Sequence, residues 1–359
     1  ILVQEDLAWS LEEIAENGPG AFYEGAVARK ISDFMEGSGG LITMDDLKSY
    51  KPVERKPVRG TYRGYEVYSM PPPSSGGVHL IQMLNILEQF PVAASGHNTA
   101  RTIHLLNEAM KLAYADRSEQ MGDPDLVSVP IETLVSKQYA KELKNKIDMT
   151  RAKPSDQISP GKIEIREGED TTHFSVIDKY GNAVSNTYTL NFSFGSKITV
   201  PGTGILLNNE MDDFSAKPGT PNAYGLVGGE SNAIAPEKRM LSSMTPTIVL
   251  KKGKPFIVTG SPGGSRIITT VLQVIINVID FGLNISEATN AVRVHHQWLP
   301  DELVAERGLS GDTADMLEAM GHDVKIGRTI GNAQSIMRIG DYYYGASDPR
   351  GPGGLAAGY

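Results

Sequence analysis

The stretch from Thr171 to Asp178 constrains the fold more than any other part of the sequence. It follows a charged run that ends at Asp170, and its residues alternate between two faces in the manner of a β-strand. One face would carry Thr171, His173, Ser175 and Ile177, and the other Thr172, Phe174 and Val176. A turn over residues 179–182 and a second strand-like run, Ala183 to Leu190, follow. The pattern predicts a β-hairpin with Thr171 at its head.

Thr171 is also a candidate nucleophile. A threonine hydroxyl reacts poorly unless a base lies beside it, and a free α-amine on the same residue can act as that base. Such an amine has a pKa of about 8, so a useful fraction is unprotonated near neutral pH. One hypothesis is that the chain cuts itself between Asp170 and Thr171, which makes Thr171 a new N-terminus. The other is an edge strand that begins with two threonines, and these residues alone favour it.

Composition and charge exclude several classes of function. The chain has a formal net charge of -9, which argues against a nucleic-acid backbone as partner. It has no cysteine, so disulfides, thiolate metal sites and thiol nucleophiles are excluded. The longest apolar stretch, Ile267 to Leu283, is too short and too polar to span a bilayer. The chain opens on Ile1 without an initiator methionine, so we expect an internal start.

Apolar periodicity and turn residues predict mixed helices and strands along the chain. A helix is predicted around residues 7–14, and Thr43 with Asp46 predicts the start of another. Further helices are predicted at 79–90, 99–121, 131–147, 267–280 and 312–320. Strands are predicted at 62–70, 247–250, 255–258, 335–338 and 342–344. Residues 148–170 lose the apolar period and predict an exposed linker, which a scissile bond requires.

The region from Asn191 to Lys238 is long, irregular and rich in glycine, proline and asparagine. Loops of this length inside compact domains are usually functional lids or disordered. Residues 218–229 have glycines near both ends and Tyr224 in the middle, which suits a lid. Upstream, Glu210 and Asp213 can hold a substrate ammonium, because paired carboxylates in a dry site favour a cation. Taken singly, such residues are more often turn or cap residues.

A glycine-rich turn, Gly260 to Arg266, joins a predicted strand to a predicted helix. It lacks the Gly-Lys-Ser/Thr ending of a nucleotide-binding loop. Consecutive glycine amides can instead face a developing oxyanion, although a plain tight turn is at least as good an interpretation. His295 and His296 are adjacent, so their side chains diverge, and the sequence has no His-Glu-x-x-His motif. We therefore expect no metal site.

Four motifs together resemble the γ-glutamyltransferase family, whose members are also known as γ-glutamyl transpeptidases or glutathione hydrolases. They are Asp170–Val176, Leu206–Phe214, Leu241–Pro246 and Gly260–Arg266, and the likeness extends to Tyr68–Gly77, Tyr114–Ser118 and Tyr344–Arg350. The resemblance covers essentially the whole chain in order. It implies an α+β fold, the four-layer αββα sandwich of the N-terminal-nucleophile hydrolases. It also implies a precursor, or zymogen, that cleaves itself into a large and a small subunit.

By this resemblance, residues 1–170 are the C-terminal part of the large subunit and 171–359 are the whole small subunit. The front part of the large subunit is absent from this numbering, and the two parts would form one composite domain as a heterodimer. The family's large subunit also supplies an arginine for the substrate α-carboxylate, and no residue here is assigned that role. A periplasmic or extracellular location is implied, and no cofactor is implied.

The resemblance implies an acyl transfer through a threonine ester. Thr171 would attack a γ-glutamyl amide, of glutathione or another γ-glutamyl compound, to form a γ-glutamyl-enzyme. Water, an amino acid or a dipeptide would then take the glutamyl group.

The resemblance also assigns roles in the site by position. The residue that hydrogen-bonds the nucleophile hydroxyl is Thr189, and those of the oxyanion hole are Gly263 and Gly264. The holders of the substrate α-ammonium are Asn191, Glu210 and Asp213. The hydroxyls for its α-carboxylate are Ser242 and Ser243. The lid tyrosine that closes over the substrate and bonds Asn191 is Tyr224.

Two other functions remain as alternatives. A cephalosporin or glutaryl acylase of the same superfamily would use the same nucleophile but needs no α-ammonium site. Glu210, Asp213 and the lid around Tyr224 favour the γ-glutamyl interpretation over this one. From another class, the chain could be a non-catalytic scaffold, cleaved or not.

Overall fold

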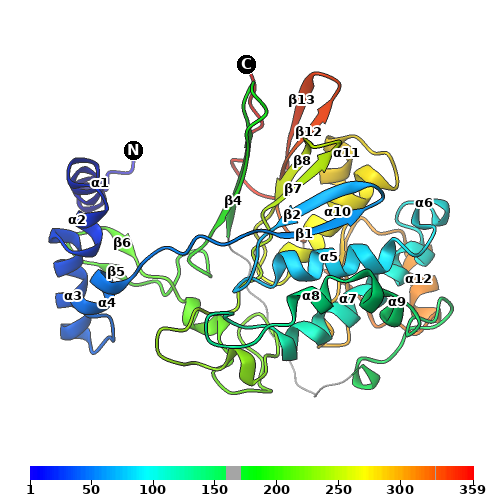
Figure 1. Cartoon of the computed structure of the whole chain (residues 1–359), viewed down its shortest axis with the longest axis horizontal. Helices are drawn as coiled ribbons and strands as arrows, with labels where there is room; N and C mark the ends of the chain where they lie inside the picture. Colours follow the sequence, from blue (N-terminus) through cyan, green and yellow to red (C-terminus); the bar gives the residue numbers. More distant parts are fainter. Residues whose placement is uncertain (159–170, 328) are drawn as a thin grey trace. The chain divides into compact units, whose positions relative to one another are not determined.

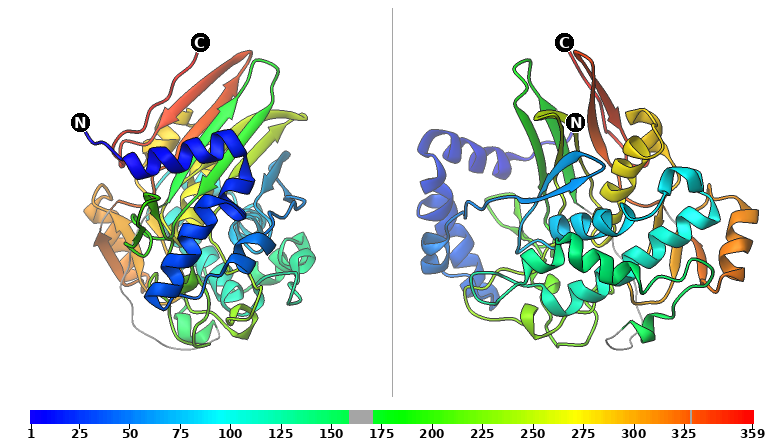
Figure 2. Two further views of the ribbon diagram at one scale, coloured as in Figure 1. Left: turned by 90° about the vertical axis from the view of Figure 1, so that its left-hand side faces the viewer. Right: turned by 45° about the vertical axis from the view of Figure 1, so that its right-hand side comes forward.

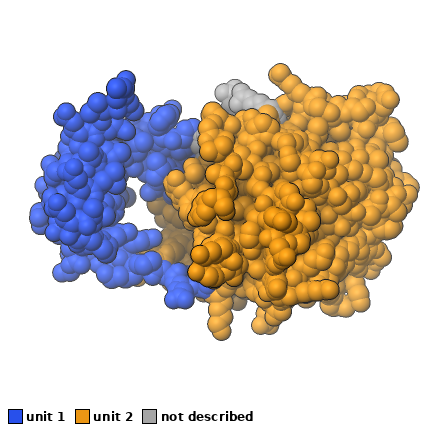
Figure 3. Space-filling model, turned by 90° about the horizontal axis from the view of Figure 1, so that it is seen from above, with its two compact units in different colours: residues 1–55, 190–210 blue, residues 56–189, 211–359 orange. Residues whose placement is uncertain are grey.

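The computed structural model describes residues 1–158, 171–327 and 329–359. They form two compact units, drawn as ribbons in Figure 1 and in separate colours in Figure 3. Unit 1 consists of Ile1–Arg55 and Leu190–Glu210, and unit 2 of Lys56–Thr189 and Met211–Tyr359. These units are defined by packing and differ from the two subunits predicted from the sequence, which would be separated by cleavage after Asp170. The cleavage stays a prediction, because Asp170 lies outside the described residues.

Unit 1 is a small helical unit with a two-stranded ribbon. Its elements are α1 (Glu5–Asn17), α2 (Pro19–Tyr23), α3 (Ala26–Ser38), α4 (Met44–Ser49), β5 (Thr199–Val200) and β6 (Ile205–Leu206). Val27 and Ile31 of α3 and Val200 of β5 form its core. The helix start predicted at Thr43 is confirmed, since its side chain and that of Asp46 form a reciprocal capping box.

Unit 2 is built on a six-stranded antiparallel sheet with the order β1-β2-β7-β8-β12-β13. The strands are β1 (Val58–Tyr62), β2 (Tyr65–Ser69), β7 (Thr247–Lys251), β8 (Lys254–Gly260), β12 (Gln334–Ile339) and β13 (Tyr342–Ser347). The strand predicted at 62–70 is confirmed as β2, although it begins only at Tyr65, because the chain turns at Arg63 and Gly64, which both have positive φ. β1, on the other side of this turn, was not predicted. The sequence did not indicate β1 because Gly60, a residue that is unfavourable in strands, lies in its middle. A Cβ at Gly60 would lie 2.5 Å from Ile81, so the strand needs a glycine where a helix packs on it.

Long buried helices form a layer on one face of this sheet (Figure 2). They are α5 (Gly76–Leu87), α7 (Ala100–Gln120) and α10 (Arg266–Ile279). α5 packs on β1 and β2, α10 packs on β8, and α7 lies against α5. Every residue of α5 is buried, so its sequence shows little amphipathic period. α5 begins at Gly76, before the predicted start at His79. Its first two residues are glycines because a Cβ there would clash with the carbonyls of Met244 and Met70, and glycines are a poor helix signal in a sequence.

The hairpin predicted from the alternating stretch is confirmed. β3 (Thr172–Ile177) pairs with β4 (Ala183–Tyr188), and the two strands pack on β7, β8 and β12. They lie on the face of the large sheet away from α5 and α10 (Figures 1 and 2). Unit 2 therefore provides three layers of the predicted αββα sandwich, namely helices, large sheet and hairpin. A helix layer outside the hairpin stays a prediction.

The hairpin packs on the large sheet with its polar face. His173 is buried, and Ser175 donates to the carbonyl of Gln334 in β12 at 2.9 Å. Phe174 and Val176 point outward and are 44% and 50% exposed. Directed hydrogen bonds from Ser175 and from Ser185 of β4 therefore help to hold the hairpin against the large sheet.

The remaining elements are short. They are α6 (Val92–Ser95), α8 (Ile131–Leu134), α9 (Lys137–Lys144), η1 (Ser155–Gln157), η2 (Glu210–Asp213), η3 (Glu230–Asn232), α11 (Ile285–Asn290), β9 (Val294–His295), β10 (Leu303–Glu306), α12 (Gly311–Ala319) and β11 (Val324–Gly327). The helix predicted at 131–147 is in fact two helices, because Ser136 caps α9 and interrupts the run. None of the helices in the described ranges is long and apolar enough to cross a membrane.

Candidate active site

Thr171 and Thr189 lie side by side at the open end of the hairpin. Thr171 directly precedes β3 and Thr189 directly follows β4, and the register pairs the intervening Thr172 with Tyr188. Thr171 Oγ1 donates a hydrogen bond to Thr189 Oγ1 at 3.3 Å. A second hydroxyl thus lies within reach of the candidate nucleophile. The Asp170–Thr171 bond itself lies outside the described residues.

His173 packs against Gly260 of β8 and so brings the nucleophile strand into contact with the large sheet. The sequence did not indicate this role. Its Nδ1 lies 2.8 Å from Thr187 Oγ1 and its Nε2 3.1 Å from Ser175 Oγ. The hydroxyl of Ser175 already donates a hydrogen bond to the carbonyl of Gln334, so its oxygen can only accept from His173 Nε2. His173 Nδ1 therefore carries no proton and accepts from Thr187. Burial lowers the pKa of His173 to about 4, so the ring is neutral at neutral pH. At Gly260 a Cβ would lie 2.3 Å from this ring, which explains the glycine that ends β8.

The glycine-rich turn between β8 and α10 presents free backbone amides. Gly263 and Gly264 have φ of +133° and +52°, values that favour glycine. Arg266 N and Ile267 N donate to the carbonyls of these two glycines, which closes the turn onto α10. Within the described residues, neither glycine N–H donates a hydrogen bond to the protein. Two such amides can stabilise an oxyanion.

Tyr224 of the predicted lid is buried against this turn. It is 4% exposed, and a Cβ on Gly264 would lie 2.6 Å from its ring. Asn222 Oδ1 accepts from Tyr224 N at 3.0 Å, an Asx turn that shapes the loop. Gln297 links the two segments, because its amide donates to the carbonyl of Tyr224 at 3.0 Å and accepts from Ser265 at 2.6 Å. Sequence reasoning missed Gln297.

Ser242 and Ser243 lie on a loop that is braced by the segment before α5. Ser242 N donates to the carbonyl of Pro73 at 2.9 Å, and Ser75 N donates to the carbonyl of Ser242 at 2.8 Å. Ser243 Oγ accepts a hydrogen bond from Arg117 of α7 at 3.1 Å. Both serines therefore have fixed backbones, and a buried cation lies behind the second one.

The three residues predicted for the ammonium end divide between the two units. Asp213 belongs to unit 2 and Asn191 and Glu210 to unit 1, so their convergence stays a prediction. In unit 1, Asn191 Nδ2 donates to the carbonyl of Asn209 at 3.1 Å, with φ of +74° at Asn191. Burial raises the pKa of Glu210 to about 7, against a hydrogen bond from the Asn191 backbone. Its Oε1 is buried and has no hydrogen-bond partner among the described residues. This carboxylate is suited to a cationic ligand.

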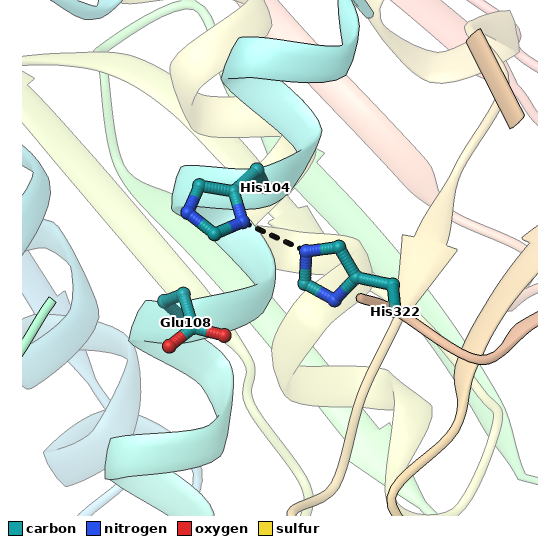
Figure 4. Close-up of side chains that lie close together, drawn as sticks. All are labelled: His104, Glu108 and His322. Atoms are coloured by element: carbon teal, nitrogen blue, oxygen red, sulfur yellow. Dashed lines mark hydrogen bonds between the residues drawn. The ribbon is translucent and has the colours of Figure 1, made fainter. Parts of the chain in front are cut away.

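His104, Glu108 and His322 form a buried group whose ligand atoms lie within 4.8 Å of one another, close enough to hold a metal ion (Figure 4). His104 Nδ1 lies 2.7 Å from His322 Nε2. Asn107 Nδ2 donates to His322 Nδ1 at 3.1 Å, so His322 Nε2 carries the proton and donates to His104. His104 Nε2 then donates to the carbonyl of Asp148 at 2.7 Å. All four ring nitrogens are thereby hydrogen-bonded.

Charge in this group also disfavours a metal ion. Lys111 pairs with Glu108 at 2.6 Å and places an ammonium where a cation would bind. Burial lowers the pKa of His322 to about 3, and it lowers that of His104, so both rings are neutral at neutral pH. We interpret the group as a structural network that ties α7 to the segment after α12. His295 and His296 also have separate partners, Thr269 and Asp301.

The comparisons agree with the geometry. A family model for gamma-glutamyltranspeptidase matches residues 1–358. The glutathione hydrolase proenzyme of Escherichia coli (strain K12) is 60% identical over 359 residues, which cover 100% of this chain and 62% of that protein. The crystal structure of cephalosporin acylase from Bacillus halodurans superposes with a TM-score of 0.87 at 31% identity, covering 99% of this chain and 62% of that chain. Gamma-glutamyltranspeptidase from Pseudomonas nitroreducens, complexed with L-DON, matches with a TM-score of 0.50 at 53% identity, covering 52% of this chain and 100% of that chain.

The fold is thus the α+β fold of the N-terminal-nucleophile hydrolases, as predicted. Within that class, the chain belongs to the gamma-glutamyltranspeptidase family. It spans somewhat less than two thirds of the length of the glutathione hydrolase proenzymes from Escherichia coli and two Pseudomonas strains.

Proposed function

We propose that the protein is a γ-glutamyltransferase that also acts as a glutathione hydrolase. The observation that carries this proposal is the position of Thr171 at the head of the hairpin, with its hydroxyl bonded to Thr189. The likeness to the glutathione hydrolase proenzyme of E. coli supports it. The proposal extends to γ-glutamyl compounds, including glutathione, as donors and to water, amino acids and dipeptides as acceptors.

The proposed reaction passes through a threonine ester. Thr171 Oγ1 attacks the carbonyl carbon of the γ-glutamyl amide while the α-amine of Thr171 takes the hydroxyl proton. The amides of Gly263 and Gly264 stabilise the oxyanion of the tetrahedral intermediate. Its collapse breaks the C–N bond, and the proton passes from the α-amine to the leaving amine. Water or an acceptor amine then attacks the γ-glutamyl-threonine ester and gives up a proton to the α-amine. The ester C–O bond breaks, and the proton passes from the α-amine to Oγ1 of Thr171.

The donor carries an α-ammonium and an α-carboxylate group, so the site must offer negative or accepting groups to the first and hydrogen-bond donors to the second. We assign the α-ammonium to Glu210, Asp213 and Asn191, and the α-carboxylate to Ser242 and Ser243. The raised pKa of Glu210 and its unpartnered buried oxygen support the first assignment. The lid residue Tyr224 would close over the bound donor and bond Asn191.

The α-amine of Thr171 must first be released from its peptide bond. We propose that the chain cleaves itself between Asp170 and Thr171, and that residues 1–170 and 171–359 belong to the two subunits of the resulting heterodimer. The E. coli relative is named a proenzyme, and the P. nitroreducens chain is matched over its whole length by 52% of this chain. Both facts support a processed enzyme.

We propose a periplasmic or extracellular location for the mature enzyme. The lack of cysteine is compatible with an oxidising compartment. Fractionation of the source cells tests this: activity confined to the cytosol would contradict it.

A glutaryl or cephalosporin acylase is the second candidate, and the superposition on the B. halodurans cephalosporin acylase favours it. The two functions differ in the group that the site must recognise. γ-Glutamyl and glutaryl donors differ only in the α-ammonium, which Glu210 and Asp213 would hold. A site built for a glutaryl group has no use for a buried carboxylate.

A matched pair of donors separates these functions. The full-length gene product is assayed with γ-glutamyl-p-nitroanilide and with glutaryl-p-nitroanilide. We expect kcat/KM to be roughly 100-fold higher or more for the γ-glutamyl donor, because a buried carboxylate loses its cation in the glutaryl complex. A preference for the glutaryl donor would establish the acylase, and no turnover of either donor would support a non-catalytic scaffold.

A further inference from the structure

Arg117 is a buried cation that has no part in the reaction described above. It lies on α7 and is 4% exposed. Its Nε donates to Ser75 Oγ at 2.8 Å and its Nη2 to Ser243 Oγ at 3.1 Å, so both partners are neutral hydroxyls. Burial lowers the pKa of Arg117, against the attraction of Tyr114 and Asp213, but a guanidinium stays charged at neutral pH. The protein therefore keeps a positive charge directly behind Ser243.

The direction of these hydrogen bonds decides what each serine can still donate. A guanidinium only donates, so Ser75 and Ser243 accept from Arg117 with an oxygen lone pair. Ser75 Oγ donates its own hydrogen bond to the carbonyl of Ser242 at 2.9 Å. Ser243 Oγ has no further acceptor for its proton among the described residues. The O–H of Ser243 is therefore available to a ligand, and the charge behind it favours an anion.

The same helix also holds the oxyanion turn and one end of the lid. Tyr114 donates from its hydroxyl to the carbonyl of Ser265, next to the two glycines. The carbonyl of Ser118 accepts from Gly229 N, at the end of the lid, at 2.7 Å. Arg117 and Ser118 follow Tyr114 by three and four residues, so each lies one helical turn from it on α7. One rigid element thus sets the spacing between Ser243 and the turn where the oxyanion would form.

We propose that Arg117 is a positioning residue for the α-carboxylate end of the donor. It fixes Ser243 as a hydrogen-bond donor and adds positive charge to that end of the site, without touching the substrate. The inference rests on the proposed γ-glutamyl function and deepens it. It adds a determinant of donor recognition that lies on α7, outside the loops that carry the predicted site residues.

A double-mutant cycle in the full-length protein tests this. Arg117→Met and Ser243→Ala should each raise KM for γ-glutamyl-p-nitroanilide about 10- to 100-fold, since each removes a charge-assisted hydrogen bond, while kcat changes little. In the Ser243→Ala background, Arg117→Met should add less than about threefold, because residues that act through one contact are not additive. Arg59→Met, at an exposed arginine paired with Glu66, is the matched control and should leave KM unchanged.

A donor pair distinguishes positioning from a merely structural role. The second donor carries an α-carboxamide in place of the α-carboxylate. Arg117→Met should lower the preference for the carboxylate donor as much as Ser243→Ala does. Equal losses for both donors, or additive losses in the cycle, would overturn the inference and leave the proposed function intact. If Arg117→Met does not fold, Arg117→Lys takes its place in the experiment. Lysine keeps the positive charge but lacks the planar guanidinium that donates to both serines, so this variant should show a partial loss of the same preference. Wild-type protein that turns over neither donor would instead refute the proposed function, and the inference with it.

Discussion

Thr171 Oγ1 lies 3.3 Å from Thr189 Oγ1, at the two adjoining ends of a single hairpin. Because β3 and β4 are paired along their whole length, the register alone brings these two hydroxyls together. The hairpin in turn is fixed to the large sheet by hydrogen bonds from its polar face. The candidate nucleophile therefore lies on a rigid element and has a partner that the same element supplies.

Removing the partner hydroxyl should slow the chemistry. Thr189→Ala should lower kcat for a γ-glutamyl anilide by about 10-fold or more, because a hydrogen bond to the reacting group contributes on the order of 1.5 kcal/mol. Thr189→Ser keeps the hydroxyl and should retain most of the activity. Steady-state kinetics of the two variants check this. Equal activity of the alanine and serine variants would contradict a role for the Thr189 hydroxyl.

A side chain at Gly264 should damage the oxyanion turn. In Gly264→Ala the new Cβ would lie 2.6 Å from the ring of Tyr224, at a φ of +52°. We expect kcat to fall by about 100-fold or more, as for loss of an oxyanion-hole donor. Gly253→Ala is the control, since Gly253 also has positive φ but open space around its Cβ position. That control should lose only about 1–2 kcal/mol of stability and no activity.

Donor affinity should depend on pH through Glu210. Burial raises the pKa of this carboxyl to about 7, so in the free protein Glu210 is increasingly protonated as the pH falls below 7. A donor ammonium needs the carboxylate form, so KM for a γ-glutamyl donor should rise as pH falls from 8 to 6. The rise approaches about 10-fold per pH unit below the pKa. Glu210→Gln should raise KM and remove this dependence, and an unchanged pH profile in that variant would place the ammonium partner elsewhere.

The network around His322 should stabilise the fold without a metal ion. His322→Ala leaves His104 and Asn107 without their partner, so the free energy of unfolding should fall by about 1–3 kcal/mol. Treatment with EDTA should leave the thermal midpoint of the wild-type protein unchanged. Thermal unfolding and elemental analysis check both expectations. A stoichiometric bound metal, or a midpoint that EDTA lowers, would show that the group is a metal site.

The sequence predicted the hairpin well because alternation and a turn are local signals. It did not predict which face points inward, because that depends on partners such as Gln334 and Thr259, which are distant in sequence. Short strands such as β9 were missed for a similar reason, since two residues carry no period. Gly60 shows the opposite problem: a local strand-breaking signal was overridden by packing against a helix.

The candidate site divides in the same way. Thr171, the glycine turn and the lid could be found from local patterns and family motifs. Arg117, His173 and Gln297 could not, because they act through contacts to segments far along the chain, namely Ser243, Gly260 and Tyr224. For Arg117 one signal was present, since it lies in Tyr114–Ser118, one of the stretches that resemble the family.

The central claim is that Thr171 becomes an N-terminal residue and acts as the nucleophile. Intact-mass spectrometry of the full-length gene product, wild type beside Thr171→Ala, tests it most directly. We expect two fragments from the wild type, the smaller beginning at Thr171, and a single uncut chain without turnover from the variant. Normal cleavage at this bond in Thr171→Ala, or an uncut wild-type chain that is fully active, would contradict the claim.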